Sequence, residues 1–593
     1  MLLSRTYNFD FDHPVDKLWE LVSDTPRWGE ASGFPKYLVS ETLQADGTVR
    51  VSGKIEIAGM TLNWEEPPVN WVAQRWFEQR RVFSKGPMIS MSNIARLEDR
   101  GLTSGLSLEL IFDTRNLLGS FIAKRLLAAF ETKVKLLLEN ADRLIRAEQP
   151  RLFVSDYQPS PSSLQRTEKL RENIEASPYE HGLSTKLVEY INTNQEVDLW
   201  AMRPIAIARR WGAQTRDVIE LFLQAVRSGL LESRWDILCP RCRVSKSTTS
   251  NMGELPRGVH CDACNIDFES DFASNVELSF SPSPSVRAVE YGHYCRSGPG
   301  VTPHIKSQCL LEPGASKSLP LSLKAGDYRI RTLEAGDEFV LTWNDDIFPK
   351  IQVHDQNIEI GGDSPRDQIA LVNNGNKQRT IVIEELNWLG DVLTAERVTT
   401  LQAFRDLFSE QVLRPGDEVS IRNISFLFSD LVGSAQLFSQ LGDADAYHIV
   451  REHFAELGEI VLRHAGSIVK TSGDGIHAAF LTPDDALRAS VEMQRSMPGF
   501  NQRLDSDNTS MRIGLHSGSS IAVTLNGVLD YYGAAVNLAA RLEGIGEAGY
   551  ITMSNAFASD PSIEAMLVDY EKHEGEKVLK GFFAATRYVQ IKP

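Results

Sequence analysis

Ile424-Ser-Phe-Leu-Phe428 is an apolar run typical of a buried strand, and the acidic residue Asp430 follows it after a single serine. Further along, Ser467-Ile-Val-Lys-Thr471 leads into Gly473-Asp-Gly475, after which a second strand-like run begins. Glycine accepts positive φ, so Gly-Asp-Gly predicts the tight turn of a β-hairpin with Asp474 at its tip. Two strand ends can therefore place the carboxylates of Asp430 and Asp474 beside each other.

Paired carboxylates predict a particular chemistry. Hard divalent cations such as Mg²⁺ and Mn²⁺ prefer carboxylate oxygens as ligands. Two such ions about 3.5–4 Å apart can activate an attacking oxygen and stabilise the leaving oxygens of a displacement at phosphorus. Asp430 and Asp474 are therefore candidate ligands of two Mg²⁺ or Mn²⁺ ions. The alternative is that Asp474 is only a turn residue and Asp430 only a helix N-cap.

A third segment, Ala535-Val-Asn-Leu-Ala-Ala-Arg-Leu-Glu543, is rich in helix formers and predicts a helix. Asn537 and Arg541 are four residues apart, so both lie on one face of that helix. Arginine offers a planar fork of donors that suits phosphoryl oxygens. The alternative is a local Asn–Arg hydrogen bond on a solvated face. Together with the two carboxylates, the pair suits a metal-bound nucleoside triphosphate.

Four segments in this order resemble the catalytic domain of class III adenylate/guanylate cyclases. The resemblance covers residues 413–593, includes Met511-Arg-Ile-Gly-Leu-His-Ser-Gly518, and implies a ferredoxin-like α/β domain. Ser429 stands where threonine is frequent in that family, and no proposed functional position is replaced. The four segments are Phe428-Ser-Asp430-Leu-Val-Gly433, Lys470-Thr-Ser-Gly-Asp474-Gly475, Asp530-Tyr-Tyr-Gly533-Ala-Ala-Val-Asn537-Leu-Ala-Ala-Arg541 and Lys580-Gly581.

The choice of base follows from donors and acceptors. Adenine presents an amino donor at N6 and an acceptor at N1, whereas guanine reverses both. A carboxylate only accepts and an ammonium only donates, so Asp530 facing N6 and Lys470 facing N1 fit adenine and mismatch guanine. In the resembling family, Lys with Asp at these positions is the adenylate combination. The alternative is that Lys470 is a surface lysine and Asp530 a loop acid.

The resemblance implies the remaining roles as well. Asn537 would orient the ribose, Arg541 would stabilise the transition state, and Lys580 would hold the triphosphate. Family members place each site across a dimer interface, which implies a homodimer here. The expected function is an adenylate cyclase that converts ATP to 3',5'-cyclic AMP and pyrophosphate. The alternatives are a guanylate or mixed-specificity cyclase, or a ligand-sensing or binding module with an inactive cyclase domain.

Whole-chain composition bounds the possibilities. The 593 residues predict several domains, and 42% hydrophobic with 24% charged content is ordinary for globular proteins. A net charge of −17 opposes a broad nucleic-acid-binding role, because such proteins usually carry basic patches. The N-terminus lacks the apolar region of a signal peptide, and no run approaches the ~18 apolar residues of a membrane span. We therefore expect a soluble cytoplasmic protein with no nucleic acid partner and no membrane span.

Four of the six cysteines occur as two pairs, Cys239-Pro-Arg-Cys242 and Cys261-Asp-Ala-Cys264. This spacing predicts a zinc ribbon over residues 236–270, in which Cys239, Cys242, Cys261 and Cys264 hold one structural Zn²⁺ ion. An iron site or redox-active cysteine pairs are the alternatives. Cys295 and Cys309 match no motif and are interpreted as ordinary residues.

Residues 1–147 begin with a strand-like run, Tyr7-Asn-Phe-Asp-Phe-Asp, and a predicted helix, Pro14-Val-Asp-Lys-Leu-Trp-Glu-Leu-Val22. Several strand-like runs follow, and a long amphipathic helix is predicted over Leu118–Ile145. This order resembles the START-like helix-grip fold of polyketide-cyclase-type proteins. The resemblance implies a cavity for a hydrophobic small molecule; the alternative is a packed domain with no ligand.

The middle of the chain predicts further units. Residues 148–163 are interpreted as a linker and residues 164–235 as a helical, winged-helix-like connector. Residues 271–412 alternate short apolar runs with turn residues, which predicts an antiparallel β-sandwich followed by a connector. The winged-helix likeness raises the alternative of a zinc-containing regulator that binds nucleic acid. The middle part also resembles an uncharacterised domain found with such cyclases, which implies no function. The chain is thus predicted to be multidomain α+β.

Overall fold

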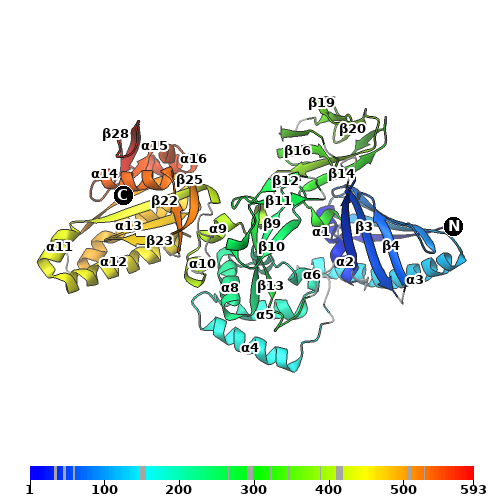
Figure 1. The fold of residues 1–593 in the computed structure, drawn as a ribbon, viewed down its shortest axis with the longest axis horizontal. Coiled ribbons are helices and arrows are strands. Elements are labelled where there is room, and N and C mark those ends of the chain that lie inside the picture. Colours follow the sequence, from blue (N-terminus) through cyan, green and yellow to red (C-terminus); the bar gives the residue numbers. More distant parts are fainter. Residues whose placement is uncertain are drawn as a thin grey trace.

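The computed structural model describes residues 1–31, 37–44, 49–57, 60–146, 155, 157–262, 264, 266–289, 298–320, 323–334, 336–344, 347–386, 389–408, 419–503, 509–525 and 528–593. Cys295, the turn at residues 414–417 and the first part of the predicted linker lie outside the described residues. Figure 1 shows the N-terminal domain at one end and the C-terminal domain at the other, with helical and β-rich segments between them.

The N-terminal domain wraps a curved antiparallel sheet around helices. Strand β1 (Leu2–Phe11) pairs with β8, and the sheet continues through β7, β6 and β5. Helices α1 (Val15–Val22) and α2 (Thr25–Ala31) follow β1, and the long α3 (Leu117–Arg146) closes the domain. The remaining strands are β2 (Leu38–Leu43), β3 (Val49–Ile57), β4 (Met60–Glu66), β5 (Asn70–Val72), β6 (Trp76–Phe83), β7 (Met88–Asp99) and β8 (Ser104–Thr114). This is the element order that the sequence predicts.

The N-terminal sheet does not stop at the domain boundary. Val72 and Trp71 of β5 pair with Ser307 and Gln308 of β14, so the sheet runs on through β21, β16 and β17. A second sheet, in the order β15-β20-β18-β19, packs on this extension around a shared apolar core. The strands are β14 (Ile305–Leu311), β15 (Ser316–Leu319), β16 (Gly326–Thr332), β17 (Glu338–Trp343), β18 (Pro349–Val353), β19 (Ile358–Asp363), β20 (Ile369–Asn373) and β21 (Arg379–Glu385).

Two features of this β-rich part differ from the predicted antiparallel sandwich. Strands β18 and β20 are parallel. Strand β19 runs back along the outer edge of β18, and the chain then returns to the other edge of β18 as β20, in the same direction as β18. The sandwich also shares one sheet with the N-terminal domain instead of standing apart. Alternation of apolar and polar residues predicts the strands but carries no information on which strand borders which.

The helical middle lies between the β-rich part and the C-terminal domain. Its core joins α8, β9 and β13 through residues such as Phe222, Trp235 and Phe280. The elements are α4 (Pro161–Glu175), α5 (Ser184–Thr193), α6 (Glu196–Leu199), α7 (Pro204–Trp211), α8 (Thr215–Ser228), β9 (Leu231–Leu238), β10 (Ser245–Thr249), η1 (Met252–Glu254), β11 (Gly258–Cys261), β12 (Ile266–Glu269), β13 (Val276–Pro282), η3 (Leu389–Asp391), α9 (Ala395–Thr399) and α10 (Gln402–Leu407). The short η2 (Pro299–Val301) instead packs on α2 of the N-terminal domain.

The structure draws two boundaries differently from the sequence. Helix α4 begins at Pro161, inside the predicted linker, because Ser160 caps it by accepting a hydrogen bond from the Ser163 amide and proline suits the first helical position. Strand β13 pairs with β9, and α9 packs on β13, so both belong to the helical middle. The predicted unit 271–412 therefore divides between two parts of the structure.

The C-terminal domain is built on one sheet in the order β23-β24-β22-β25-β27-β29-β28, whose first four strands have the ferredoxin-like arrangement. Successive residues of β22 face opposite sides: Phe426 joins the core shared with the helical middle, whereas Leu427 faces α12 and α13. The elements are β22 (Val419–Val432), α11 (Ser434–Leu441), α12 (Asp443–Arg463), β23 (Ser467–Ser472), β24 (Gly475–Phe480), α13 (Pro483–Arg503), β25 (Ser510–Leu525), β26 (Val528–Tyr532), α14 (Ala534–Ile545), β27 (Ile551–Ser554), α15 (Asn555–Ala558), α16 (Pro561–Met566), η4 (Leu567–Asp569), β28 (Lys572–Val578) and β29 (Ala585–Ile591).

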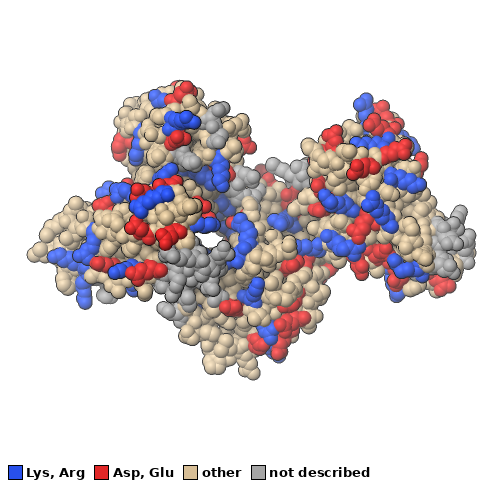
Figure 2. All heavy atoms as spheres, turned by 180° about the vertical axis from the view of Figure 1, so that it is seen from behind, with Lys and Arg blue, Asp and Glu red and all other residues tan. Residues whose placement is uncertain are grey.

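The surface carries mixed charge. Over the face seen in Figure 2, lysine and arginine side chains are interspersed with aspartate and glutamate. Of the helices that the structure describes, none is long and apolar enough to cross a membrane.

Candidate active site

The structure places Asp430 and Asp474 together, as the sequence predicts. Asp430 lies near the end of β22, and Asp474 lies in the turn between β23 and β24. The hairpin fits closely against β22, because a Cβ on Gly475 would lie 1.8 Å from the Ser429 carbonyl oxygen. The Ser429 hydroxyl accepts a hydrogen bond of 3.2 Å from the Ile476 amide. Gly475 and Ser429 thus hold the two carboxylates side by side.

The electrostatics of this pair suit a cation. Burial and the neighbouring charge of Asp474 raise the pKa of Asp430 above its ordinary value. The Oδ2 atom of Asp474 is buried and has no hydrogen-bond partner among the described residues. A buried acceptor without a donor is costly unless a cation or a proton satisfies it. The two residues therefore fit divalent cations.

Two residues that the sequence did not predict complete this corner. Arg512 of β25 lies opposite Asp430 in the sheet register and donates a hydrogen bond of 2.5 Å to its carboxylate. The same guanidinium lies 2.5 Å from a carboxylate oxygen of Glu543, on α14. Arg512 therefore offsets two negative charges beside the site. The antiparallel register between β22 and β25 was the missing signal, because 82 residues separate the partners.

Lys470 and Asp530 also meet, from β23 and β26. The Lys470 ammonium donates a hydrogen bond of 2.7 Å to Asp530 Oδ2, and Asp530 Oδ1 accepts one of 2.7 Å from the Tyr531 amide. Both oxygens of Asp530 are engaged, and its side chain is only 9% exposed, compared with 52% for Lys470. The carboxylate is therefore fixed, while the lysine extends from it toward solvent.

His477 lies beneath the Lys470–Asp530 pair. It stands opposite Lys470 in the β23–β24 register and stacks on Phe428 with ring centroids 4.3 Å apart. Burial lowers the pKa of His477 to about 3, so the ring is neutral at pH 7. Neither ring nitrogen has a hydrogen-bond partner within the described part of the chain. His477 is therefore a buried, uncharged aromatic ring that packs next to the Lys470–Asp530 pair.

The other predicted residues lie apart from these pairs. Asn537 and Arg541 are exposed on one face of α14, and Lys580 is exposed in the turn between β28 and β29. Within the residues that the structure describes, none of the three makes a hydrogen bond or ion pair with the Asp430–Asp474 pair or with the Lys470–Asp530 pair. The fold confirms the predicted helix and its i, i+4 spacing but does not bring Asn537, Arg541 and Lys580 to one place.

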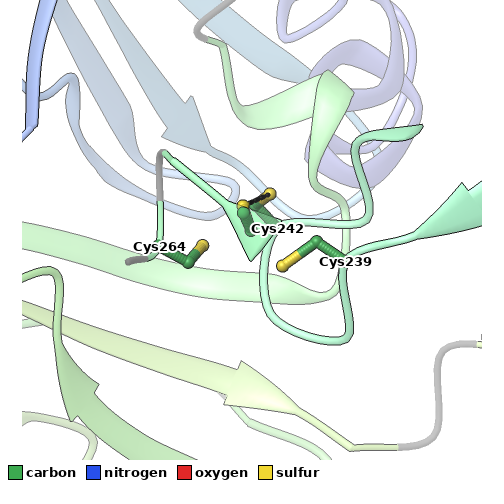
Figure 3. A group of neighbouring side chains, drawn as sticks. Cys239, Cys242 and Cys264 are labelled. Atoms are coloured by element: carbon green, nitrogen blue, oxygen red, sulfur yellow. Dashed lines mark hydrogen bonds between the residues drawn. The ribbon is translucent and has the colours of Figure 1, made fainter. Parts of the chain in front are cut away.

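The four predicted cysteines converge in a separate cluster. Cys239, Cys242, Cys261 and Cys264 present sulfur atoms that all lie within 4.8 Å of one another (Figure 3). The Cys242 and Cys261 sulfurs are 3.7 Å apart. Four thiolates around a tetrahedral Zn²⁺ ion with Zn–S bonds of about 2.3 Å would be separated by about 3.8 Å. The cluster therefore fits zinc.

Two parts of the chain match known families. Residues 417–587 match the family described as "Adenylate and Guanylate cyclase catalytic domain". Residues 169–297, which include most of the helical middle and the cysteine cluster, match a "Family of unknown function (DUF5939)". The C-terminal domain is thus an adenylate/guanylate cyclase catalytic domain.

Curated relatives are similar to part of the chain. Adenylate cyclase 2 of Rhizobium meliloti (strain 1021) is 29% identical over 183 residues, which are 28% of this chain and 48% of the relative. Receptor-type guanylate cyclase gcy-4 of Caenorhabditis briggsae is 24% identical over 255 residues, 40% of this chain and 20% of the relative. The chain thus spans about half or less of the length of these relatives.

Two solved structures are also similar to part of the chain. The adenylyl cyclase CyaB from P. aeruginosa is 23% identical, with a TM-score of 0.27 and coverage of 30% of this chain and 95% of that chain. An adenylate/guanylate cyclase/hydrolase from Silicibacter pomeroyi is 29% identical, with a TM-score of 0.26 and coverage of 30% and 99%.

Proposed function

We propose that the C-terminal cyclase domain is an adenylate cyclase, which converts ATP to 3',5'-cyclic AMP and pyrophosphate. The observation that carries this choice is the Lys470–Asp530 contact of 2.7 Å beside a fixed Asp530 carboxylate. One donor-only and one acceptor-only group together match N1 and N6 of adenine. Guanine would leave both groups facing like partners, at a cost of about 1–3 kcal/mol for the buried Asp530 carboxylate.

Asp430 and Asp474 are the proposed ligands of two Mg²⁺ or Mn²⁺ ions. Bound there, the ions supply charge that activates the ribose 3'-hydroxyl and stabilises the leaving pyrophosphate. The chain contributes the two carboxylates, fixed by the tight fit of Gly475 against β22. Arg512 keeps Asp430 oriented and compensates its charge.

Asn537 and Arg541 are proposed to act on the nucleotide of a second copy of the chain. Both side chains are exposed on a single face of α14, and among the described residues neither bonds to the Lys470–Asp530 pair. These two features support a site shared across a homodimer. In that arrangement Asn537 orients the ribose and Arg541 stabilises charge in the transition state. Lys580 is proposed to hold the triphosphate, on the strength of its family position alone.

The nearest alternative is a guanylate or mixed-specificity cyclase, because the relatives carry both names. Cyclic nucleotide production by the purified full chain separates these possibilities when ATP and GTP are supplied apart, each with Mg²⁺ or Mn²⁺. We expect cyclic AMP from ATP and little cyclic GMP from GTP. Comparable rates with both nucleotides would contradict the role given to Lys470 and Asp530.

A second candidate function belongs to the N-terminal domain, which we propose to be START-like. A cavity of about 190 Å³ lies between its sheet and helices, and its lining includes Trp28, Phe77, Leu108 and Phe130. Asn93 also lines it, and its Oδ1 atom is buried without a hydrogen-bond partner in the described residues. This combination supports a hydrophobic small molecule that carries one donor group. Native mass spectrometry of the full chain tests it, and a cavity that retains no small molecule would contradict it.

A further inference from the structure

Helix α10 joins the helical middle to strands β23 and β26, which carry Lys470 and Asp530. On one side, Phe404 packs edge-on against Trp235 of β9, with ring centroids 6.1 Å apart. Upstream of α10, the Leu278 amide of β13 donates a hydrogen bond of 2.9 Å to the Leu393 carbonyl. Trp235 and Phe404 are almost completely buried. Helix α10 is therefore anchored in the core of the helical middle.

The opposite side of α10 holds strand β26 through Arg405. The Arg405 guanidinium donates a hydrogen bond of 2.9 Å to the Leu529 carbonyl, one residue before Asp530. It also lies 5.2 Å above the ring of Tyr531, one residue after Asp530. The Tyr531 hydroxyl in turn donates a hydrogen bond of 3.3 Å to the Thr399 carbonyl of α9. Asp530 is thus flanked on both sides by contacts to α9 and α10.

Gln402 makes the matching contact to strand β23. Its Oε1 atom accepts a hydrogen bond of 2.8 Å from the Ile468 amide. The register of β23 against β24 shifts between Ile468 and Lys470, so this amide lies at an irregularity that re-aims the lysine. The Gln402 side chain is itself fixed, because its amide donates a hydrogen bond of 2.7 Å to Asp406.

We propose that α10 sets the geometry of adenine recognition, with Arg405 and Gln402 as positioning residues for Asp530 and Lys470. This inference rests on the proposed adenylate cyclase function. Base selectivity requires both groups at fixed places, because a displaced donor or acceptor no longer distinguishes adenine from guanine. Lys470 is largely exposed, so its position depends on its backbone anchor. The helical middle thereby gains a physical connection to substrate choice.

The test compares three variants of the full-length chain. Arg405→Ala removes both contacts to β26, and Arg405→Lys retains a positive charge and one donor. Arg397→Ala is the matched control, because Arg397 is a half-buried arginine of α9 with no side-chain hydrogen bond to the catalytic strands among the described residues. Values of kcat and KM are measured with ATP and with GTP.

For Arg405→Ala we expect the KM for ATP to rise and the preference for ATP over GTP to fall about tenfold, the effect of one lost hydrogen bond to a charged group. The loss in kcat should be smaller, Arg405→Lys should recover part of the preference, and Arg397→Ala should match the unchanged chain. An unchanged ATP preference in Arg405→Ala would overturn the proposal.

A second readout does not depend on turnover. Amide hydrogen exchange of full-length Arg405→Ala should accelerate at residues 528–532, and that of Gln402→Ala at residues 467–472, while exchange in α12 stays the same. Unchanged exchange at both strands overturns the positioning role, whether or not the chain is active. If the unaltered chain forms no cyclic nucleotide but the exchange changes appear, the proposed function fails and the positioning role stands.

Discussion

At the residue scale, a buried carboxylate oxygen of Asp474 without a donor distinguishes the proposed metal site. Asp430→Asn and Asp474→Asn keep side-chain shape but remove the charge that would bind the cations. We expect each to lower kcat at least about a hundredfold, since metal-ion stabilisation is worth several kcal/mol. The fold should persist, and Mn²⁺ should no longer raise the Tm of either variant. Asp569→Asn, on an exposed acid of the same domain, is the control. Substantial turnover in Asp474→Asn would contradict the assignment.

The Lys470–Asp530 contact gives a prediction about substrate choice. Asp530→Asn replaces an acceptor-only group with an amide that also donates. We expect kcat/KM for ATP to fall about tenfold to a hundredfold, while kcat/KM for GTP changes less. Steady-state kinetics with the two nucleotides measure this. Equal losses with ATP and GTP would indicate a general defect instead of altered base recognition.

A buried histidine outside the site predicts a pH dependence of stability. His453 of α12 packs edge-on against Phe500 of α13, and burial lowers its pKa to about 4. Because the folded-state pKa lies below the unfolded value of about 6.5, the stability is complete above pH 6.5 and is lost as the pH falls toward 4. The difference amounts to about 2 kcal/mol at pH 5.

The urea midpoint of unfolding should therefore fall less between pH 7 and pH 5 in His453→Leu than in the unaltered chain. The midpoint can be followed by hydrogen exchange in α12, with the unaltered chain compared at the same pH. An identical acid-induced drop in both proteins would show that His453 does not titrate on unfolding.

Sequence reasoning found the residues whose type carries the chemistry, and it missed those whose importance comes from position. Asp430, Asp474, Lys470 and Asp530 meet in pairs because short motifs place them at strand ends and turns. Arg512 depends on the β22–β25 register, which no local pattern contains. The substitution of serine at position 429 leaves in place the hydroxyl that binds the hairpin, and only the structure gives that hydroxyl a role.

At the element scale, the turn between Cys239 and Cys242, here called the cysteine knuckle, docks on the β-rich part of the molecule. His304 donates a hydrogen bond of 2.8 Å to the Arg241 carbonyl, and Arg329 donates one of 3.1 Å to the Pro240 carbonyl. We propose that one zinc ion per chain holds this knuckle in shape. Metal analysis should give one equivalent of zinc, and Cys261→Ser should lose it.

Loss of that zinc should loosen the knuckle and its neighbours. In Cys261→Ser we expect faster hydrogen exchange at residues 239–262, with little change in the N-terminal helix α1. Cys309→Ser is the control, because Cys309 is a buried cysteine outside the cluster. Exchange that is the same in both variants would contradict a structural metal.

The prediction of element boundaries was limited because proline and serine occur both in linkers and at the first positions of helices. Proline and serine before residue 163 predicted a linker, yet Ser160 and Pro161 start α4. The strands of the β-rich part were predicted by alternation, but the continuation of the N-terminal sheet across β5 and β14 depends on pairing between residues more than 230 positions apart.

At the scale of the whole molecule, the proposed homodimer makes a quantitative prediction. Mixing Asp430→Asn chains with Arg541→Ala chains should restore activity, because a mixed dimer has one site with intact metal ligands and an intact arginine. Random pairing gives half mixed dimers with one working site of two, so about a quarter of the original activity should return. No recovery after subunit exchange would place all catalytic groups of a site in one chain.

The most direct measurement is the product balance of the purified full-length chain with ATP and Mn²⁺. Mass spectrometry identifies the nucleotide product, and a coupled assay measures pyrophosphate. We predict cyclic AMP and pyrophosphate in equal amounts, with neither formed by Asp474→Asn. Hydrolysis of ATP to ADP or AMP without cyclic AMP, or equal product from the Asp474→Asn chain, would contradict the proposed cyclase.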